Sequence, residues 1–403
     1  MNRLVQKCCI SIIIMQFLML GLCIVNMGDN AIAEEGISEE YLEDYEQFWD
    51  IIKNSSPFYS NILELYDVHS IYLDGRRTVQ QRVTSSEGLL LTLKGVCSQL
   101  GNFAHLQVID APYYYRLVSR DENLFNGTDY RYSMVNNEVT RNFYSSIYRK
   151  ESEQKSTCAN FPSVYYPEQK TLCYNIASFY YEEALDPTYS GIVDMLENCN
   201  DEIMNVVFDI RGNRGGYDSG WRYIVSQFTE NVEWNRVAYC VDTSDSRQFL
   251  DQFFLTYAPI NRLDALYPKV IKTNANLLCT FYSEVFPLET YAGNRYKEKV
   301  QRWVIMDEKC YSAADEFVEF CIETGWATVV GKQATSGDGL SFLGSRWFRL
   351  TNSGILFQMS MGAAINSDGS LNVLNGSSGY LLCPPRIDEL TYVLNLISKS
   401  LAS

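Results

Sequence analysis

The chain has 403 residues and carries 33 Lys and Arg against 49 Asp and Glu, which gives a formal net charge of −16 at pH 7. An acidic chain without a cluster of lysines or arginines is a poor candidate for binding nucleic acid or an anionic membrane surface. Its length suffices to bury a large core and predicts two or three subdomains.

The first 33 residues have the pattern of a secretory signal peptide. Two basic residues precede an apolar run over residues 8–25, and Ala31-Ile32-Ala33 ends the segment. A basic start, an apolar middle and an A-x-A site are the signals for export and cleavage. We expect cleavage near Ala33 and a secreted or extracytoplasmic mature chain. An uncleaved membrane anchor is the alternative, and only then would the protein associate with a membrane.

The segment that follows is predicted to be helical. Aromatic and aliphatic residues recur there three and four positions apart, as on one face of a helix: Tyr41, Tyr45, Phe48, Trp49 and Ile52. A second helix is expected over residues 86–100. Residues 101–108 then alternate between polar and apolar, which is typical of a strand.

The second half of the chain is predicted to alternate strands with helices. Strands are expected over residues 172–179, 203–208, 236–241, 303–306, 327–331 and 354–361. Helices are expected over residues 191–196, 219–228, 248–257, 313–324 and 387–398. Repeated units of this kind, with glycine loops at strand ends, predict an α/β or mixed layered core.

A glycine loop follows one of these strands. The strand ends in Asp209-Ile210-Arg211, and Gly212, Gly215 and Gly216 follow within five residues. Glycines let consecutive backbone N–H groups turn toward one point, which forms a nest for an anion. Such a nest binds a phosphate or stabilises the oxyanion of an acyl-transfer reaction. The phosphate interpretation is weak, because neither G-K-S/T nor G-x-G-x-x-G is present.

Ser312 lies between a predicted strand and a predicted helix. A serine at a helix start is commonly an N-cap, and Asp315 three residues later is a suitable capping-box partner. From the residues alone, a cap and a nucleophile are both open.

The sequence gives little support for a metal site or for a catalytic cysteine. Nine cysteines lie beyond residue 33, scattered and without a C-x-x-C pair, and the only histidines are His69 and His105. We therefore expect no zinc site and no cofactor. An odd number of cysteines leaves at least one thiol unpaired in any disulfide pattern. Cys310, close to Ser312, is not expected to be a nucleophile, because no histidine is near it in sequence.

Three motifs together resemble one family. The D-x-R-G-N-x-G-G loop at residues 209–216, the S-A-x-D of residues 312–315 and the glycine-rich residues 325–339 match, in order and spacing, the C-terminal processing (tail-specific) and tricorn-core serine peptidases. The resemblance covers roughly residues 166–395. It implies a crotonase-like or ClpP-like spiral of ββα units and a polypeptide substrate.

The resemblance also suggests how the chain is divided. Many members carry a PDZ domain before the core, but the tyrosine-rich residues 109–165 are too few for one, so we expect a short β-rich insert that lines the cleft. The expected division is a signal peptide (1–33), an N-terminal helical cap domain (34–108), a tyrosine-rich insert or connecting segment (109–165) and the peptidase core (166–403).

The resemblance assigns roles to the two central motifs. Ser312 would be the nucleophile, and the N–H groups of Ala313 and of Gly215 or Gly216 would form the oxyanion hole. The side chains of Asp209 and Arg211 are expected to brace the loop rather than touch substrate.

The general base is where the sequence departs from the family. Processing peptidases use a lysine at the position that Asp338 occupies here, and Lys332 is not a convincing substitute. Tricorn-like members use a histidine from a G-x-[ST]-H loop, which His105 matches except that Ala104 replaces the hydroxyl residue. His105 is therefore the expected base, and Asp338 either supports it or is a surface carboxylate.

Two main functions follow from this departure, and a different acyl-transfer hydrolase on the same scaffold is also open. The first is an active secreted serine endopeptidase that uses Ser312 and His105. The second is a degenerate member that binds peptides or protein C-termini without cleaving them. Retention of the serine, the glycine loop and a histidine favours the first, whereas loss of the lysine and of a C-terminal glutamate favours the second.

Overall fold

The computed structural model describes residues 39–120, 130–148, 163–179, 203–228, 231–252, 255–262, 276–287, 300–337 and 341–402. The expected signal peptide and the predicted helix over residues 191–196 lie outside these ranges. Residues 39–403 form one compact unit. The domain boundaries expected within that unit stay predictions.

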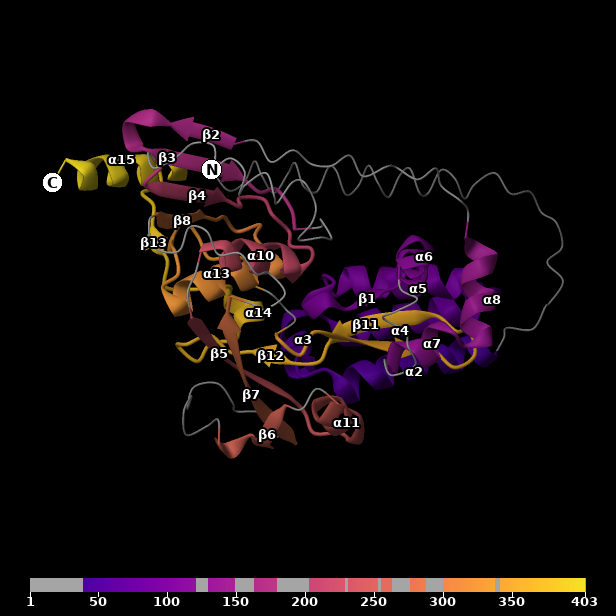
Figure 1. Cartoon of the computed structure of the whole chain (residues 1–403). Helices are drawn as coiled ribbons and strands as arrows, with labels where there is room; N and C mark the ends of the chain where they lie inside the picture. The colour runs from indigo at the N-terminus through magenta and orange to yellow at the C-terminus, as the bar shows by residue number, and fades with distance from the viewer. Residues whose placement is uncertain are drawn as a thin grey trace, which may run out of the picture. The chain divides into compact units, whose positions relative to one another are not determined.

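The N-terminal part of this unit is helical, as expected. Its helices are α2 (Glu39–Ser55), α3 (Tyr59–Leu65), α4 (Val68–Arg82) and α5 (Ser86–Gln99) (Figure 1). The helices α2 and α5 match the predicted ones, whereas α3 and α4 lie in the segment predicted to be helical but were not predicted individually. Side-chain caps start α4 and α5: Asp67 accepts from the Ser70 N–H, and Ser85 accepts from the Gly88 N–H.

The prediction of a β-rich insert is wrong for most of the described residues of the tyrosine-rich segment. Only residues 163–165, at the start of a strand, are extended as predicted, whereas the rest form three helices, α6 (Ala111–Arg120), α7 (Tyr130–Val135) and α8 (Glu138–Ile147). Tyrosine favours strands on average, but packing overrides such preferences. Here Tyr114 of α6 stacks on Tyr144 of α8, with ring centroids 4.1 Å apart.

A six-stranded sheet forms the centre of the second half. Its strands lie in the order β13-β9-β8-β4-β3-β2. All neighbours are parallel except β2, which pairs antiparallel with β3. The strands are β2 (Ser163–Tyr166), β3 (Thr171–Asn175), β4 (Asn205–Asp209), β8 (Gln301–Ile305), β9 (Thr328–Gly331) and β13 (Leu381–Leu382).

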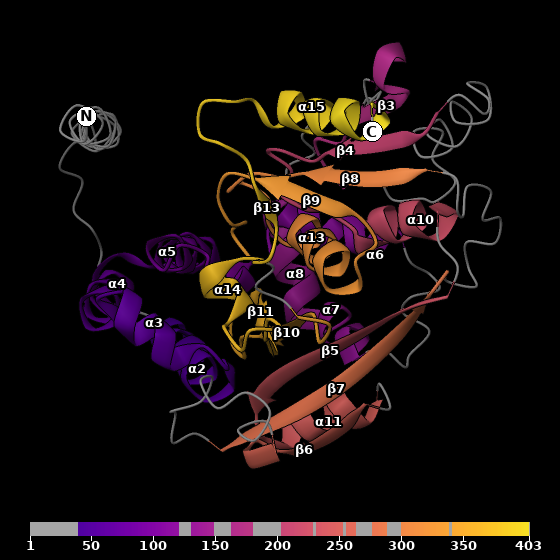
Figure 2. The ribbon, with the colours of Figure 1, turned by 90° about the vertical axis from the view of Figure 1, so that its left-hand side faces the viewer.

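Helices cover both faces of this sheet. On β4, the side chains of Val206 and Phe208 belong to the cluster formed with α10 (Asp218–Phe228) and α13 (Ala313–Thr324). Val207, between them, faces the opposite way and packs with α15 (Glu389–Leu401). In Figure 2, α15 and α13 accordingly lie on opposite sides of β8 and β9. The predicted mixed α/β core is confirmed.

Two smaller sheets complete the fold. A four-stranded sheet has the order β12-β5-β7-β6, and a three-stranded sheet has the order β1-β11-β10. Their strands are β1 (Gln107–Val108), β5 (Val232–Val241), β6 (Thr256–Pro259), β7 (Leu277–Phe286), β10 (Ser345–Arg349), β11 (Leu356–Ser360) and β12 (Ala363–Ala364). The remaining helices are α11 (Ser244–Gln252) and α14 (Asn372–Asn375). The helix predicted over residues 248–257 is therefore displaced, because its end pairs with β7 as β6.

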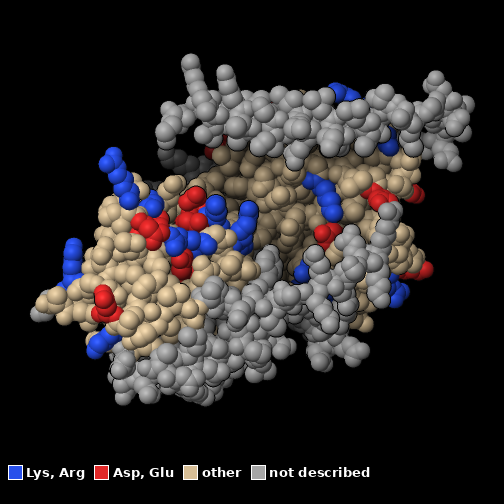
Figure 3. Space-filling view, turned by 90° about the horizontal axis from the view of Figure 1, so that it is seen from above, with Lys and Arg blue, Asp and Glu red and all other residues tan. Residues whose placement is uncertain are grey.

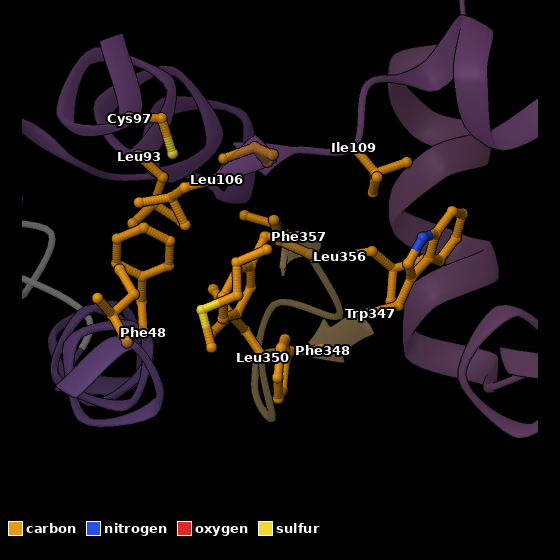
Figure 4. Packing of buried hydrophobic residues seen from close by; sticks show 14 of the residues in the cluster. Phe48, Leu93, Cys97, Leu106, Ile109, Trp347, Phe348, Leu350, Leu356 and Phe357 are labelled. Carbon is orange, nitrogen blue, oxygen red and sulfur yellow. The ribbon is translucent and has the colours of Figure 1, made fainter. Parts of the chain in front are cut away.

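A large apolar cluster joins the N-terminal helices to β10 and β11. Phe48 of α2 packs edge-on against Phe357 of β11, with ring centroids 4.8 Å apart (Figure 4). The buried carboxylate of Asp44 strengthens the junction, because it accepts the N–H groups of Asn352 and Ser353 at 2.9 and 2.6 Å. The loop that carries His105 is held against the second half of the chain at this junction.

Candidate active site

Ser312 occupies the N-cap position of α13, but its side chain does not cap the helix. Its backbone has φ 58° and ψ −130°, a region that non-glycine residues rarely adopt. The expected capping-box partner, Asp315, is bonded elsewhere: its carboxylate accepts from Thr335, Asn372 and Ser377. The capping interpretation of Ser312 is therefore wrong, and its hydroxyl is available for another role.

Asp315 ties the first turn of α13 to two later segments. Burial of its carboxyl raises its pKa, although the three hydrogen bonds act in the opposite direction. The N–H of Ser312 also donates to the carbonyl of Gly337 at 3.1 Å. These contacts fix the backbone on both sides of the serine.

His105 reaches Ser312 from a strained turn. The strand predicted over residues 101–108 is mostly a short 3-10 turn, Phe103–His105, and only Gln107–Val108 form β1. Asn102, Ala104 and His105 all have positive φ, which a strand cannot accommodate. The Nε2 atom of His105 lies 3.1 Å from the Oγ of Ser312, a residue 207 positions away in sequence.

Tyr311 contacts the other nitrogen of the same imidazole. Its hydroxyl lies 3.1 Å from the Nδ1 of His105. The two rings are also stacked, with centroids 4.9 Å apart and planes inclined by 17°. No sequence motif singled out Tyr311, because its contact depends on a turn far away in the chain.

The glycine loop lies against the serine. A Cβ atom on Gly215 would be 2.8 Å from the Cβ of Ser312 and 3.0 Å from the N of Ala313, so only glycine allows this approach. The N–H of Gly215 donates to the Oδ1 of Asn213 at 2.8 Å. Within the described part of the chain, the N–H groups of Gly216 and Ala313 donate to no acceptor. Those two groups are thus free to stabilise an oxyanion, whereas that of Gly215 is committed to the loop.

Arg211 braces the loop, as expected. Its guanidinium forms a fork with the carboxylate of Asp209, at 2.9 and 2.6 Å. It also donates to Asp388 at 2.8 Å and Glu389 at 2.9 Å, at the start of α15. Lys332 pairs with the same Glu389 at 3.1 Å. That ion pair occupies Lys332 with a structural partner.

The other candidates are placed as follows. Asp338 lies outside the described residues. Cys310 is buried, and its thiol donates to the carbonyl of Ile210 at 3.1 Å. Burial raises the pKa of this thiol, which disfavours the nucleophilic thiolate. His69 lies on α4, near Asp67, and has no contact with Ser312 among the described residues.

A cavity of about 510 Å³ opens beside the serine. Ser312, Ala313 and Gly216 line it together with Ser219, Ser341 and Gly344. The other lining residues are charged or aromatic: Asp218, Arg222, Arg236, Tyr282, Glu316 and Phe342. Although burial opposes its ionisation, the pKa of Glu316 is lowered because Arg236 and Arg222 lie beside it. The nucleophile and the two N–H groups thus face a space large enough for a side chain of a bound peptide.

Neither the charges on the face shown in Figure 3 nor the metal-ligating residues of the described ranges give a second candidate. Basic and acidic side chains lie next to one another on that face. Among the residues that the structure describes, no group of three His, Cys, Asp or Glu is arranged to hold a metal ion. No helix in those ranges is both long and apolar enough to cross a membrane. The seven cysteines found there are buried.

Residues 173–373 match the model of peptidase family S41. The chain belongs to peptidase family S41. This family consists of serine peptidases, which are hydrolases, so polypeptides are the substrate class of the family. The matched residues of this S41 peptidase include the glycine loop and Ser312, whereas His105 precedes them.

Solved structures are similar to this S41 peptidase at low sequence identity. Mature CPAF in complex with lactacystin is 10% identical, over 91% of this chain and 98% of that chain, with a TM-score of 0.49. A lipoprotein from Streptococcus agalactiae is 10% identical, over 93% and 100%, with a TM-score of 0.49. The photosystem II D1 C-terminal processing protease is 10% identical, over 90% and 97%, with a TM-score of 0.44. No curated protein matches the sequence.

Proposed function

We propose that this S41 peptidase is a secreted serine endopeptidase in which Ser312 is the nucleophile and His105 the general base. The observation that carries the proposal is the 3.1 Å contact between Ser312 Oγ and His105 Nε2. Both residues have positive φ, at 58° and 59°. Strain of this kind costs about 1–3 kcal/mol per residue, persists only where the surrounding structure holds it, and is concentrated at active sites.

The chemistry follows from the positions of these groups. Nε2 takes the proton of the Ser312 hydroxyl as Oγ bonds to the carbonyl carbon of a peptide. The oxyanion that forms accepts hydrogen bonds from the N–H groups of Gly216 and Ala313. The imidazolium of His105 then gives its proton to the amide nitrogen, the C–N bond breaks, and water hydrolyses the acyl-enzyme in the same way. Each oxyanion donor is worth about 2.7–4 kcal/mol.

Export belongs to the same proposal. The basic start, the apolar run and the A-x-A site predict cleavage near Ala33. The N-terminal sequence of the protein recovered from the producing cell tests this: a chain that begins at about Glu34 supports cleavage and export, whereas one that begins at Met1 contradicts cleavage and leaves the uncleaved anchor.

The alternative is a member that binds peptides or chain ends without cleaving them. The observation in its favour is in the sequence, where Asp338 occupies the position of the family lysine. Asp338 could instead support His105. Either function would use the cavity beside Ser312, so only an assay of chemistry separates them.

A fluorophosphonate probe provides that assay, because it bonds covalently only to an activated serine. We expect labelling at Ser312, located by mass spectrometry, that is absent in Ser312→Ala and falls at least about a hundredfold in His105→Ala. His69→Ala is the matched control, since it removes the only other histidine. No labelling of the folded protein would favour the peptide-binding alternative. Labelling that survives His105→Ala would assign the base elsewhere.

A further inference from the structure

We propose that Tyr311 is the positioning residue of the catalytic base, so that the third member of the site comes from the residue next to the nucleophile. This inference rests on the proposed function, in which His105 is the base. It is carried by two contacts of one ring: His105 Nε2 lies 3.1 Å from Ser312 Oγ, and His105 Nδ1 lies 3.1 Å from the Tyr311 hydroxyl.

The backbone explains how two neighbouring side chains reach one imidazole. In an extended chain, adjacent side chains point to opposite sides. At Ser312 the chain instead turns through φ 58° and ψ −130°. The N–H of Tyr311 donates to the carbonyl of Asn213 at 3.2 Å, and that of Ser312 donates to Gly337 at 3.1 Å. Backbone hydrogen bonds on both residues thus hold the turn that directs both side chains to His105.

The hydrogen bond at Nδ1 determines which nitrogen carries the proton. A general base needs a lone pair on Nε2, facing the serine, and therefore a proton on Nδ1. The phenolic oxygen of Tyr311 accepts that Nδ1–H. The stacked rings, 4.9 Å apart, also restrict rotation of the imidazole. Tyr311 would thus fix both the tautomer and the orientation of the base.

A phenol and a carboxylate differ in what they contribute. A carboxylate at this position orients the ring and also stabilises the imidazolium by its charge, and loss of that group costs about 10⁴-fold in rate. A neutral phenol provides orientation with little charge stabilisation. We therefore expect loss of the Tyr311 hydroxyl to slow labelling of Ser312 by about ten- to a hundredfold, a smaller loss than that of a carboxylate.

The tautomer can be measured without an assay of activity. Protein labelled with ¹⁵N-histidine and carrying His69→Gln has His105 as its only histidine, so long-range ¹H–¹⁵N spectra report one ring. We would compare it with Tyr311→Phe in the same background, and with Tyr72→Phe as a control. Tyr72 also loses a hydroxyl hydrogen bond, at 2.7 Å to Glu46, but on the N-terminal helices.

The outcomes separate this inference from the proposed function. We expect Nδ1–H in the parent, a shift toward Nε2–H in Tyr311→Phe, and no change in Tyr72→Phe. If Nε2–H dominates in the parent, or if Tyr311→Phe changes neither the tautomer nor the labelling rate, the inference is wrong. If the tautomer responds but the parent is not labelled by the fluorophosphonate, Tyr311 still positions His105 and the proposed peptidase activity is wrong.

Discussion

Backbone strain is concentrated around the serine. Seven non-glycine residues in the described part of the chain have positive φ, and five of them are in the His105 turn, at Ser312 or in the lining of its cavity: Asn102, Ala104, His105, Ser312 and Ser341. Each such residue costs of order 1–3 kcal/mol, so the surrounding structure must hold it in place. At Ser312, the hydrogen bonds of Asp315 and the close packing of Gly215 provide this support.

Gly215 and Gly212 form a matched pair of residues with which to test the close approach of the glycine loop to Ser312. Gly215→Ala would place a Cβ atom against Ser312 and Ala313, whereas Gly212→Ala meets no atom within 4 Å. Both positions have positive φ, 91° and 77°, so both substitutions strain the backbone. We expect Gly215→Ala alone to reduce fluorophosphonate labelling, by about 10²-fold or more, because it displaces an oxyanion donor. Equal labelling rates in the two variants would contradict the proposed geometry.

At the scale of elements, α15 fixes the end of β4. Asp388 caps α15 by accepting a hydrogen bond from the N–H of Thr391 at 3.1 Å. It also accepts a hydrogen bond from Arg211, whose guanidinium donates in turn to Asp209 at the end of β4. Although burial opposes ionisation, these hydrogen bonds lower the pKa of Asp388. The start of α15 therefore holds the end of β4 in place, and the glycine loop begins at that end.

Two substitutions at Asp388 distinguish the stabilisation by the helix cap from that by the ion pair with Arg211. Asp388→Ala loses both and should lower the free energy of unfolding by about 1 kcal/mol at pH 7, as cap removal does. Asp388→Asn retains an acceptor for the cap and should lose less. Because the pKa is lower in the folded state, the stabilisation is complete above the unfolded value of 3.8 and is lost only as pH falls below it. Urea unfolding at several pH values measures this, and a loss already complete at pH 5 would contradict it.

Some helices and strands could be predicted from the sequence because the residues that determine them are neighbours in the chain. The helix α13 was predicted over residues 313–324 and is found as Ala313–Thr324, since Gly325, with φ 68°, ends it. The strands β7 and β10 were not predicted. Their stabilisation comes from antiparallel partners, β5 and β11, that are distant in sequence, and no periodicity in the chain reports such pairing.

The same division applies to the candidate site. Gly216 lies in a glycine loop after a strand, and Ser312 lies at a helix start; both are local patterns that the sequence alone predicts. The family resemblance then predicts that these two patterns lie close together. The contact of Tyr311 with His105 joins two positions 206 residues apart, and the buried pair of Arg222 and Glu284 joins positions 62 residues apart. Only the fold brings such residues together.

At the scale of the whole molecule, the N-terminal helices and the second half share one core. Phe48, fully buried, packs against Leu93 and Phe357 in Figure 4. The cluster that contains them spans α2 to α5 as well as β10 and β11. We therefore expect the helical cap to unfold together with the rest rather than separately.

Phe48→Ala tests this coupling. Removal of a buried phenylalanine should lower the free energy of unfolding by about 3–5 kcal/mol, whereas Leu91→Ala, on a residue 62% exposed, should change it by less than about 0.5 kcal/mol. Two buried free thiols, Cys97 on α5 and Cys321 on α13, report the two halves by iodoacetamide modification in urea. We expect both thiols to become reactive at the same urea concentration. Earlier modification of Cys97 would show that the cap unfolds alone.

The strand β1, two residues after His105, pairs with Phe357 and Gln358 of β11. During translation His105 leaves the ribosome about 250 residues before that partner, because chains emerge from the N-terminus. A chain still being synthesised therefore lacks the pairing that holds the histidine at the serine. A peptidase activity that depends on this contact would therefore arise only after nearly the whole polypeptide has been made.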